Sequence, residues 1–218
     1  MPGLTHKIFG GTALYPKVKA LGHYPDYFWW VLRGKPVRSP HLLKQRTVLE
    51  YGKLYRLRTF IEVGTYYGEM IDAVLAHFDR IYSIEVNAEL AALARRRFQR
   101  YPQVHILEGD SQRKLPELLA GIGEPALFWL DGGYNLWAGQ RGSDDRLLIE
   151  LQAILSHRVP NHIVLLDDAR GLTGQHGTLT AAQLKAKIEH EFPERQVAIE
   201  RDILRITRRQ AVDVYPRI

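Results

Sequence analysis

Short apolar runs alternate with amphipathic stretches along the chain from residue 59 onward. The runs have the length and composition of buried strands, and the stretches between them show the spacing of amphipathic helices. This alternation is typical of right-handed βαβ units, which build a parallel sheet. The predicted strands are 59–64, 80–86, 104–108, 126–131 and 162–167, and the helices between them are 69–78, 88–101, 112–120 and 144–156.

The pattern changes near the C-terminus. After a helix over 181–191, two apolar runs at 196–200 and 203–207 are separated only by Arg201 and Asp202. So short a connection predicts an antiparallel hairpin that closes the sheet. The expected fold class is therefore α/β: a Rossmann-like, doubly wound, mostly parallel seven-stranded sheet with a C-terminal antiparallel hairpin.

Residues 1–58 differ from the rest in charge. They contain 11 basic and 2 acidic side chains, whereas residues 59–218 contain 19 basic and 22 acidic ones. A basic segment favours an anionic partner, namely nucleic acid, a phosphorylated substrate or a lipid head group, although a solvated basic surface is the simpler interpretation. We therefore divide the chain into a basic N-terminal arm with a cap helix, 1–58, and a main domain, 59–218.

The residues up to 40 are rich in Gly, Pro and aromatic side chains, which interrupt regular elements. We expect an irregular arm that packs on the main body, with the aromatic cluster at 24–30 contributing to core packing. A helix is predicted over 41–56.

The overall composition excludes several classes of protein. Of the 218 residues, 45% are hydrophobic and 25% are charged, which is typical of a globular protein. The chain has no cysteine, so disulfides, thiolate metal sites and cysteine nucleophiles are excluded. No apolar run approaches the roughly 18 residues that cross a bilayer, and the N-terminus lacks the apolar core of a secretory signal. These features predict a cytoplasmic protein without a membrane span.

Acidic residues end every predicted parallel strand. Because ligands of open α/β sheets bind beyond the carboxyl ends of the strands, these side chains mark the expected site. Gly64 and Gly68 bracket the first turn, and Glu85 follows at a spacing suited to binding the hydroxyls of a ribose. Tyr66 stands where a nicotinamide-binding turn needs glycine, and Glu62 would repel a pyrophosphate. The pattern therefore favours S-adenosylmethionine, an adenosine cofactor that carries positive charge.

Three motifs follow the first three strands: Glu-Val-Gly-Thr-Tyr-Tyr-Gly at 62–68, Ile-Glu-Val-Asn at 84–87 and Gly-Asp-Ser-Gln at 109–112. Together they resemble the class I methyltransferases, and within them the metal-dependent catechol O-methyltransferase-like and macrocin-type groups. The phrases at 128–131 and 166–170 are similar to an uncharacterised bacterial methyltransferase family. The resemblance implies that the three motifs hold the methionine moiety, the ribose and the adenine, respectively. The implied cofactor-binding residues are Glu62, Gly64, Thr65, Tyr66, Gly68, Glu85, Asp110, Ser111, Gln112 and Asp131.

The resemblance also implies a metal site. Asp131 at the end of the fourth strand, and the pair Asp167 and Asp168 at the end of the fifth, match the residues that bind Mg²⁺ in that group. Carboxylate oxygens suit Mg²⁺ or another divalent cation, which would lower the pKa of a coordinated hydroxyl and orient its oxygen. The alternative is that Asp167 caps the following turn and Asp168 pairs with Arg170.

The catalytic base departs from the pattern of that group. The resemblance predicts a lysine three residues after Asp131, and Tyr134 stands there instead. Tyr134, His176 or a metal-bound hydroxide could accept the proton, and Asp131 completes the set of candidate catalytic residues.

Two segments are candidate walls of the substrate site. The glycine-containing stretch 135–145 is expected to be a flexible lid, in which Arg141 grips an anionic group of the substrate or is simply solvated. His41 and Lys44, at the start of the N-terminal helix, belong to the other wall.

These features predict an S-adenosylmethionine-dependent O-methyltransferase that acts, with a divalent cation, on a small hydroxylated molecule such as a sugar or glycan precursor. The alternatives are a methyltransferase that binds RNA through the basic arm, and a cofactor-binding module without catalysis. The RNA alternative is disfavoured because the chain contains no recognisable RNA-binding module and no Asn-Pro-Pro-Tyr/Phe motif. A homodimer is compatible with the sequence.

Overall fold

The computed structural model describes residues 25–34, 39–131, 143–175 and 179–209. Its strands are β1 (Thr59–Val63), β2 (Arg80–Glu85), β3 (Val104–Glu108), β4 (Ala126–Leu130), β5 (Ile163–Leu166), β6 (Arg195–Glu200) and β7 (Ile203–Arg208). They form one sheet in the order β3-β2-β1-β4-β5-β7-β6. Strands β1 to β5 pair in parallel, whereas β7 runs antiparallel between β5 and β6. The predicted fold class is confirmed, including the C-terminal hairpin.

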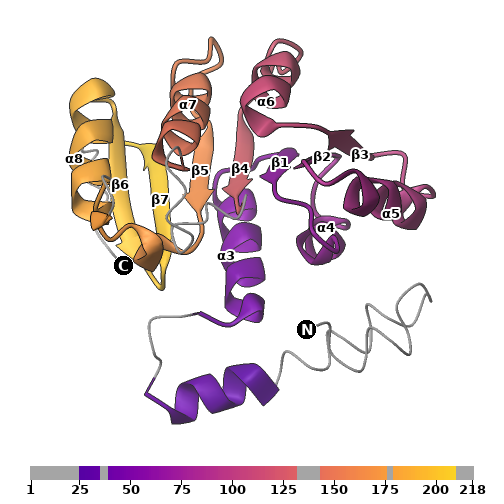
Figure 1. The fold of residues 1–218 in the computed structure, drawn as a ribbon, viewed down its shortest axis with the longest axis horizontal. Coiled ribbons are helices and arrows are strands. Elements are labelled where there is room, and N and C mark those ends of the chain that lie inside the picture. Colours follow the sequence, from indigo (N-terminus) through magenta and orange to yellow (C-terminus); the bar gives the residue numbers. More distant parts are fainter. Residues whose placement is uncertain (1–24, 35–38, 132–142, 176–178, 210–218) are drawn as a thin grey trace.

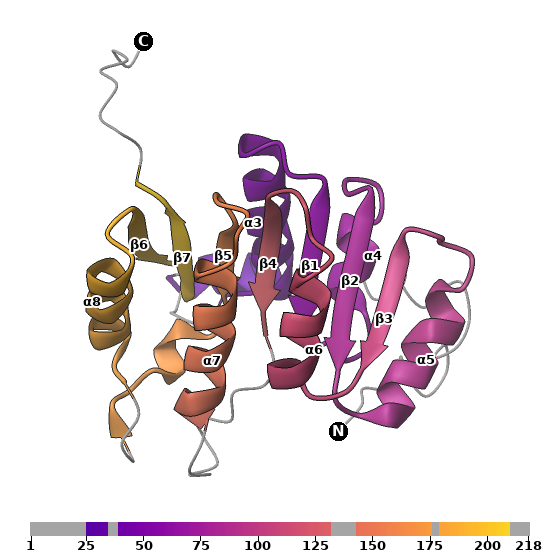
Figure 2. The same ribbon diagram turned by 90° about the horizontal axis from the view of Figure 1, so that it is seen from above.

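Helices cover both faces of the sheet, as a doubly wound fold requires. They are α3 (His41–Leu54), α4 (Glu69–Val74), α5 (Ala88–Phe98), α6 (Ser111–Leu119), α7 (Ser143–Leu155), α8 (Ala181–Glu191) and the 3₁₀ helix η1 (Ala169–Gly171). Figures 1 and 2 show α3 and α4 on one side of the sheet and α6, α7 and α8 on the other. Phe98 of α5 packs in the same core as α3 and α4, so α5 belongs to their layer.

Two hydrophobic cores lie on opposite faces of the sheet. Ile61 and Phe128 belong to the core under α6, α7 and α8, and their chain neighbours Phe60 and Trp129 belong to the other core. Successive side chains of a strand point to opposite faces, so a central strand covered on both sides must be apolar almost throughout. All five residues of β1 and of β4 are indeed buried.

Two helices end earlier than the sequence pattern predicts. Helix α4 ends at Val74 and not near residue 78, and α5 ends at Phe98 and not near residue 101. Phe78 extends the apolar spacing of α4, but it lies outside the helix and packs on Phe60, with ring centroids 5.4 Å apart. The N–H of Asp79 donates to the carbonyl of Arg58 at 2.9 Å. Tertiary contacts therefore turn the chain towards β2 before the helical pattern is complete.

The N-terminal arm differs from the prediction where it is described. Residues 25–32 form a helix and not an irregular segment, and Figure 1 shows this helix apart from the sheet. Phe28 and Trp29 are 59% and 57% exposed, so the predicted packing of these two side chains in the core is wrong. Their rings meet edge to face, with centroids 6.2 Å apart, within the range of aromatic pairs. Tyr24 lies outside the described residues.

Helix α3, by contrast, is firmly part of the main body. Val48 is fully buried in the core on its face of the sheet. Just before the helix, the hydroxyl of Ser39 donates to the carbonyl of Arg201 in the β6–β7 turn at 2.7 Å. The division of the chain at residue 58 remains a prediction. In the residues that the structure describes, no helix is long and apolar enough to cross a membrane.

The turn between β1 and α4 depends on Gly68, which has a φ of 73°. In a Gly68→Ala variant the new Cβ would lie 2.6 Å from the ring of Phe98. We expect urea denaturation to show a loss of about 2 kcal/mol in the free energy of unfolding. Gly123→Ala is the matched control, because its Cβ would meet no atom within 4 Å. An unchanged stability of Gly68→Ala would contradict this conformation of the turn.

Candidate active site

The carboxyl ends of the parallel strands are held in register by hydrogen bonds just beyond the strands. The N–H of Asp131 donates to the carbonyl of Val63 at 2.9 Å. The N–H of Asp167 donates to the carbonyl of Leu130 at 3.0 Å. The acidic residues that follow neighbouring strands are therefore brought to one edge of the sheet, as their positions in the sequence predict.

A cavity of about 350 Å³ opens at this edge, beside the ends of β1, β2, β3 and β4. Its volume lies at the small end of the range for small-molecule sites. Six of the predicted cofactor-binding residues line it, whereas Glu62, Thr65, Gly68 and Gln112 do not. The six are Gly64, Tyr66, Glu85, Asp110, Ser111 and Asp131.

Glu85, at the end of β2, binds the turn between β1 and α4 that borders this cavity. One carboxylate oxygen accepts the N–H of Tyr66 at 2.8 Å, and the other accepts the N–H of Asn87 at 2.9 Å. Tyr66 has a φ of 48° and Gly64 a φ of 98°, so the turn bends back on itself. The N–H of Gly68 closes the turn on the carbonyl of Thr65 at 2.8 Å. The predicted ribose-binding acid therefore also shapes the turn beside it.

Glu62 lies in the layer beneath the cavity. The residue is 2% exposed, and its carboxyl accepts a hydrogen bond of 2.6 Å from the hydroxyl of Ser83. Ser83 is also 2.6 Å from the hydroxyl of the predicted site residue Thr65. Burial raises the pKa of Glu62 to about 8, and the nearby Asp131 and Glu85 carboxylates act in the same direction while Ser83 opposes them. At neutral pH the Glu62 carboxyl therefore holds a proton.

Asp110 and Ser111, which follow β3, are fixed by hydrogen bonds at the start of α6. Asp110 caps this helix, and its carboxylate accepts the N–H of Gln112 at 3.0 Å. The hydroxyl of Ser111 donates to Glu150 of α7 at 2.5 Å. These bonds hold Asp110 and Ser111 beside the cavity that they line.

Asp131 joins the cavity to a second acidic group. The residue keeps exposed surface at the rim, while its carboxyl is surrounded largely by protein. The loss of water around this carboxyl and repulsion from Asp167 raise the pKa of Asp131 to about 7, although Lys44 lowers it. Asp131 therefore changes charge near neutral pH.

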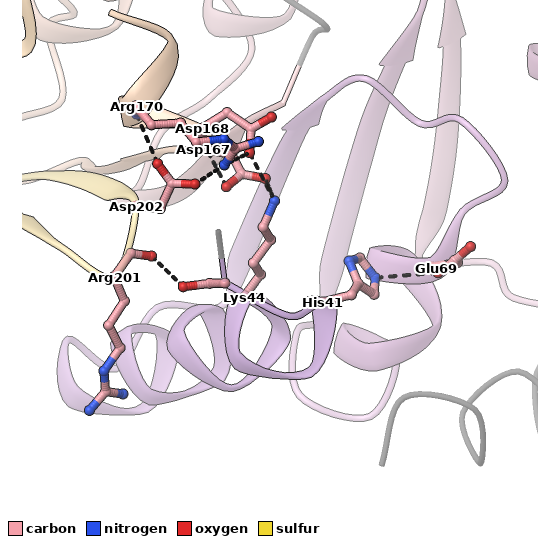
Figure 3. Close-up of polar contacts among 9 residues, drawn as sticks. His41, Lys44, Glu69, Asp167, Asp168, Arg170, Arg201 and Asp202 are labelled. Carbon is pink, nitrogen blue, oxygen red and sulfur yellow. Dashed lines mark hydrogen bonds and ion pairs between the residues drawn. The ribbon is translucent and has the colours of Figure 1, made fainter. Parts of the chain in front are cut away.

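Lys44 of α3 binds both acidic residues that follow β5 (Figure 3). Its ammonium forms a short ion pair with Asp167 and a hydrogen bond of 3.2 Å with Asp168. The side chain of Asp167 is fully buried and that of Lys44 is 13% exposed. Burial alone would lower the pKa of Lys44, but attraction to Asp167 raises it above the ordinary value. The ammonium is therefore charged and compensates the buried carboxylate.

Arg170 supplies a second cation to this cluster. It lies 2.8 Å from Asp168 and also forms an ion pair with Asp202, whose carboxylate accepts the N–H of Arg170 at 2.8 Å. Burial alone would raise the pKa of Asp168, but Lys44 and then Arg170 lower it below the ordinary value. Asp167 accepts the N–H of Asp168 at 2.8 Å, which holds Asp168 at a φ of 53°.

The predicted magnesium site is not supported by this arrangement. Asp167 and Asp168 already share the ammonium of Lys44, and Asp168 also binds Arg170. Within the described ranges, no group of three or more His, Asp or Glu side chains is arranged to hold a metal ion. The donor set therefore does not fit a divalent cation in this conformation. The alternative expectation, in which Asp168 pairs with Arg170, is the one that the structure bears out.

Some predicted residues cannot be placed, and others were missed. Tyr134, His176 and Arg141 lie outside the described residues, as does the predicted lid up to residue 142. Arg146 of α7 lines the cavity, and no signal in the sequence distinguished it from other helical arginines. Lys44 was expected in a wall of the site, but its pairing with Asp167 was not predicted. The two residues are 123 positions apart, so no local pattern connects them.

Comparisons with known proteins support the fold. No protein-family model matches the chain, and no curated protein is significantly similar to it. Among solved structures, the SAH-bound methyltransferase PaMTH1 of Podospora anserina is 19% identical, with a TM-score of 0.57 over 84% of this chain and 86% of that one. The O-methyltransferase TomG of Streptomyces achromogenes, in complex with SAM, is 14% identical, with a TM-score of 0.56 over 82% and 85%. The O-methyltransferase of Bacillus cereus, in complex with SAH, is 12% identical, with a TM-score of 0.54 over 82% and 86%. At these identities, the likeness establishes a shared Rossmann-like fold.

The protonated state of Glu62 makes stability depend on pH. The folded-state pKa of about 8 lies above the ordinary value of 4.5, so the folded protein binds a proton that the unfolded chain has lost. The free energy of unfolding should therefore fall as pH rises from 5 to 8, by up to about 1.4 kcal/mol for each pH unit. Asp131, whose pKa is also raised, contributes to this loss in both proteins, so Glu62→Gln should show a smaller loss than the wild type. Urea denaturation of both proteins across that range measures the difference, which is the part due to Glu62. A difference that does not vary with pH would contradict a buried, protonated Glu62.

Proposed function

We propose that this protein is an S-adenosylmethionine-dependent methyltransferase that methylates a hydroxyl group of a small molecule. The observation that carries the proposal is the cavity beyond the ends of β1 to β4, which has acidic side chains and a bent glycine-containing turn in its lining. Ligands of doubly wound sheets bind at this edge. The solved structures of the same fold that contain SAM or SAH are consistent with this cofactor.

The cofactor would lie across the ends of the first four strands. Glu85 would accept hydrogen bonds from the ribose hydroxyls, and Asp110 and Ser111 would border the adenine. The methionine moiety would pass over the turn at Gly64 and Tyr66, where Gly64 has no side chain to obstruct it. This assignment uses the residues that line the cavity, with Glu62, Thr65, Gly68 and Gln112 supporting them from outside it.

The charges of the site favour a cationic cofactor. Glu85, Asp110 and Asp131 face the cavity, whereas Glu62 behind its wall is protonated and adds no charge. The sulfonium and ammonium of S-adenosylmethionine would be attracted to the three acidic groups that face the cavity, whereas the pyrophosphate of a dinucleotide would be repelled. After methyl transfer the sulfur is neutral, so the acidic surroundings hold the product less strongly than the substrate cofactor.

The reaction would be an in-line displacement. The acceptor oxygen forms a bond to the methyl carbon while the carbon–sulfur bond breaks, and its electron pair stays on sulfur. The hydroxyl proton must leave the oxygen, and Asp131 is the candidate acceptor because it borders both the cavity and the Asp167–Asp168 pair. Holding the two reactants in line supplies a large part of the rate enhancement.

Arg146 suggests the kind of acceptor. It is a cationic residue lining a cavity that otherwise carries acidic ones. A guanidinium at this position would bind a carboxylate or phosphate group of the acceptor. An anionic hydroxylated small molecule is therefore our preferred substrate class. A cytoplasmic location and a homodimeric state remain predictions of the sequence.

A methyltransferase acting on RNA is the second candidate. Phe28 and Trp29 are exposed within the basic N-terminal segment, and exposed aromatic rings near cations can stack on unpaired bases. Salt-dependent binding of single-stranded RNA that is lost in Trp29→Ala would favour this candidate. Methylation of hydroxylated small molecules without RNA would favour the first.

The cofactor assignment is tested by Glu85→Gln. Loss of the carboxylate removes a charged acceptor for the ribose hydroxyls, so calorimetry should show S-adenosylmethionine binding weakened by about tenfold or more. Glu108→Gln is the matched control, because Glu108 pairs with Glu85 in the strand register but does not line the cavity. Equal affinities in the wild type and Glu85→Gln would refute the ribose assignment, provided that circular dichroism shows both to be folded.

A further inference from the structure

The acidic residues after β5 receive a positive charge from an unexpected element. Lys44 lies on α3, before the first strand, and its ammonium reaches both Asp167 and Asp168 (Figure 3). The side chain of Asp167 is fully buried, whereas the side chain of Asp168 is 41% exposed. One carboxylate is thus closed off by the ammonium, and the other still faces the open edge of the sheet.

Helix α3 is fastened on both sides of this contact. Ser39, before the helix, is bonded to the β6–β7 turn, and His41 lies 3.6 Å from Glu69 at the start of α4. Val48, one turn after Lys44, is fully buried against the sheet. Figure 3 shows Lys44 extending from the anchored helix to the aspartates. The ammonium is therefore delivered by a rigid part of the fold and not by a loose surface side chain.

The two aspartates after β5 are already occupied by cations. Lys44 binds Asp167 and Asp168, and Arg170 binds Asp168 and Asp202. The negative charge that remains, with a contribution from Asp131, is therefore not concentrated on these two carboxylates. A divalent ion at the predicted position would have to displace the ammonium from Asp167, against a hydrogen-bonded ion pair in a buried place. It would also lie close to the Arg170 guanidinium.

We propose that Lys44 permanently takes the place of the divalent cation at this site, so that the ammonium–aspartate pair positions the acceptor hydroxyl without a metal. Asp168, the more exposed carboxylate, would accept a hydrogen bond from a neighbouring polar group of the acceptor, so that the reacting hydroxyl keeps its proton for Asp131. The part that concerns the acceptor rests on the proposed function. The exclusion of divalent cations by Lys44 does not, because it concerns only the charges of this chain.

Binding of Mn²⁺ to the full chain tests the exclusion. We expect electron paramagnetic resonance to show almost no Mn²⁺ bound by the wild type, and binding tighter by about tenfold or more in Lys44→Ala, which frees the two aspartates. Adding Asp168→Ala to Lys44→Ala should remove the gain. Lys187→Ala, which breaks an ion pair with Glu191 on α8, is the control and should behave as the wild type does.

Each outcome decides the proposal. Equal Mn²⁺ affinities in the wild type and Lys44→Ala would overturn it, whether both proteins bind the ion or neither does. If Lys44→Ala does not fold, because Asp167 is left buried and unpaired, circular dichroism with and without Mn²⁺ replaces the titration. Recovery of the folded signal by Mn²⁺ would support the proposal. If Mn²⁺ restores the folded signal of neither Lys44→Ala nor Lys44→Gln, the proposal is overturned.

A titration of the same samples with S-adenosylmethionine separates the two proposals. A wild type that ignores S-adenosylmethionine would refute the proposed function and leave the Mn²⁺ comparison standing. A wild type that binds S-adenosylmethionine and also binds Mn²⁺ as tightly as Lys44→Ala would refute only the role of Lys44. With an acceptor in hand, methyl transfer by the wild type should be unchanged by a chelator.

Discussion

Repulsion between like charges is the constraint that this structure has to satisfy. Parallel strands deliver their carboxyl ends to one edge of the sheet, and this chain follows neighbouring strands with acidic residues. Several carboxylates within reach of one another, partly shielded from water, cannot all be ionised without compensation. The protein meets the problem in two ways: it buries Glu62 in its protonated form, and it brings Lys44 and Arg170 to the aspartates after β5.

The two solutions give the two halves of the site different properties. Burial keeps Glu62 protonated behind the wall of the cavity, so this residue adds no charge at the ends of β1 and β2. The ammonium of Lys44 stands on the docked helix α3 and is paired with both aspartates. In the proposed function, the first half would hold the cofactor and the second would place the acceptor.

Helix α3 links the N-terminal segment to the chemistry. Sequence composition separates residues 1–58 from the rest, yet α3 packs into the core through Val48 and carries the lysine of the site. The helix over 25–32 behaves differently, because Phe28 and Trp29 stay exposed. The predicted arm thus contains one element that completes the site and another whose apolar side chains find no place in the core.

The sequence by itself determined the sheet, the order of strands and helices, and the gathering of acidic side chains at one edge. Those features follow from the local spacing of apolar residues, which predicts each strand and helix, and from the common direction of parallel strands, which places their carboxyl ends at one edge. Helix ends such as that of α4 depended on packing, here of Phe78 on Phe60. The partner of Asp167 was decided only by the tertiary structure. Lys44 and Asp167 meet across 123 residues because α3 docks on the face of the sheet, and no spacing along the chain encodes that contact.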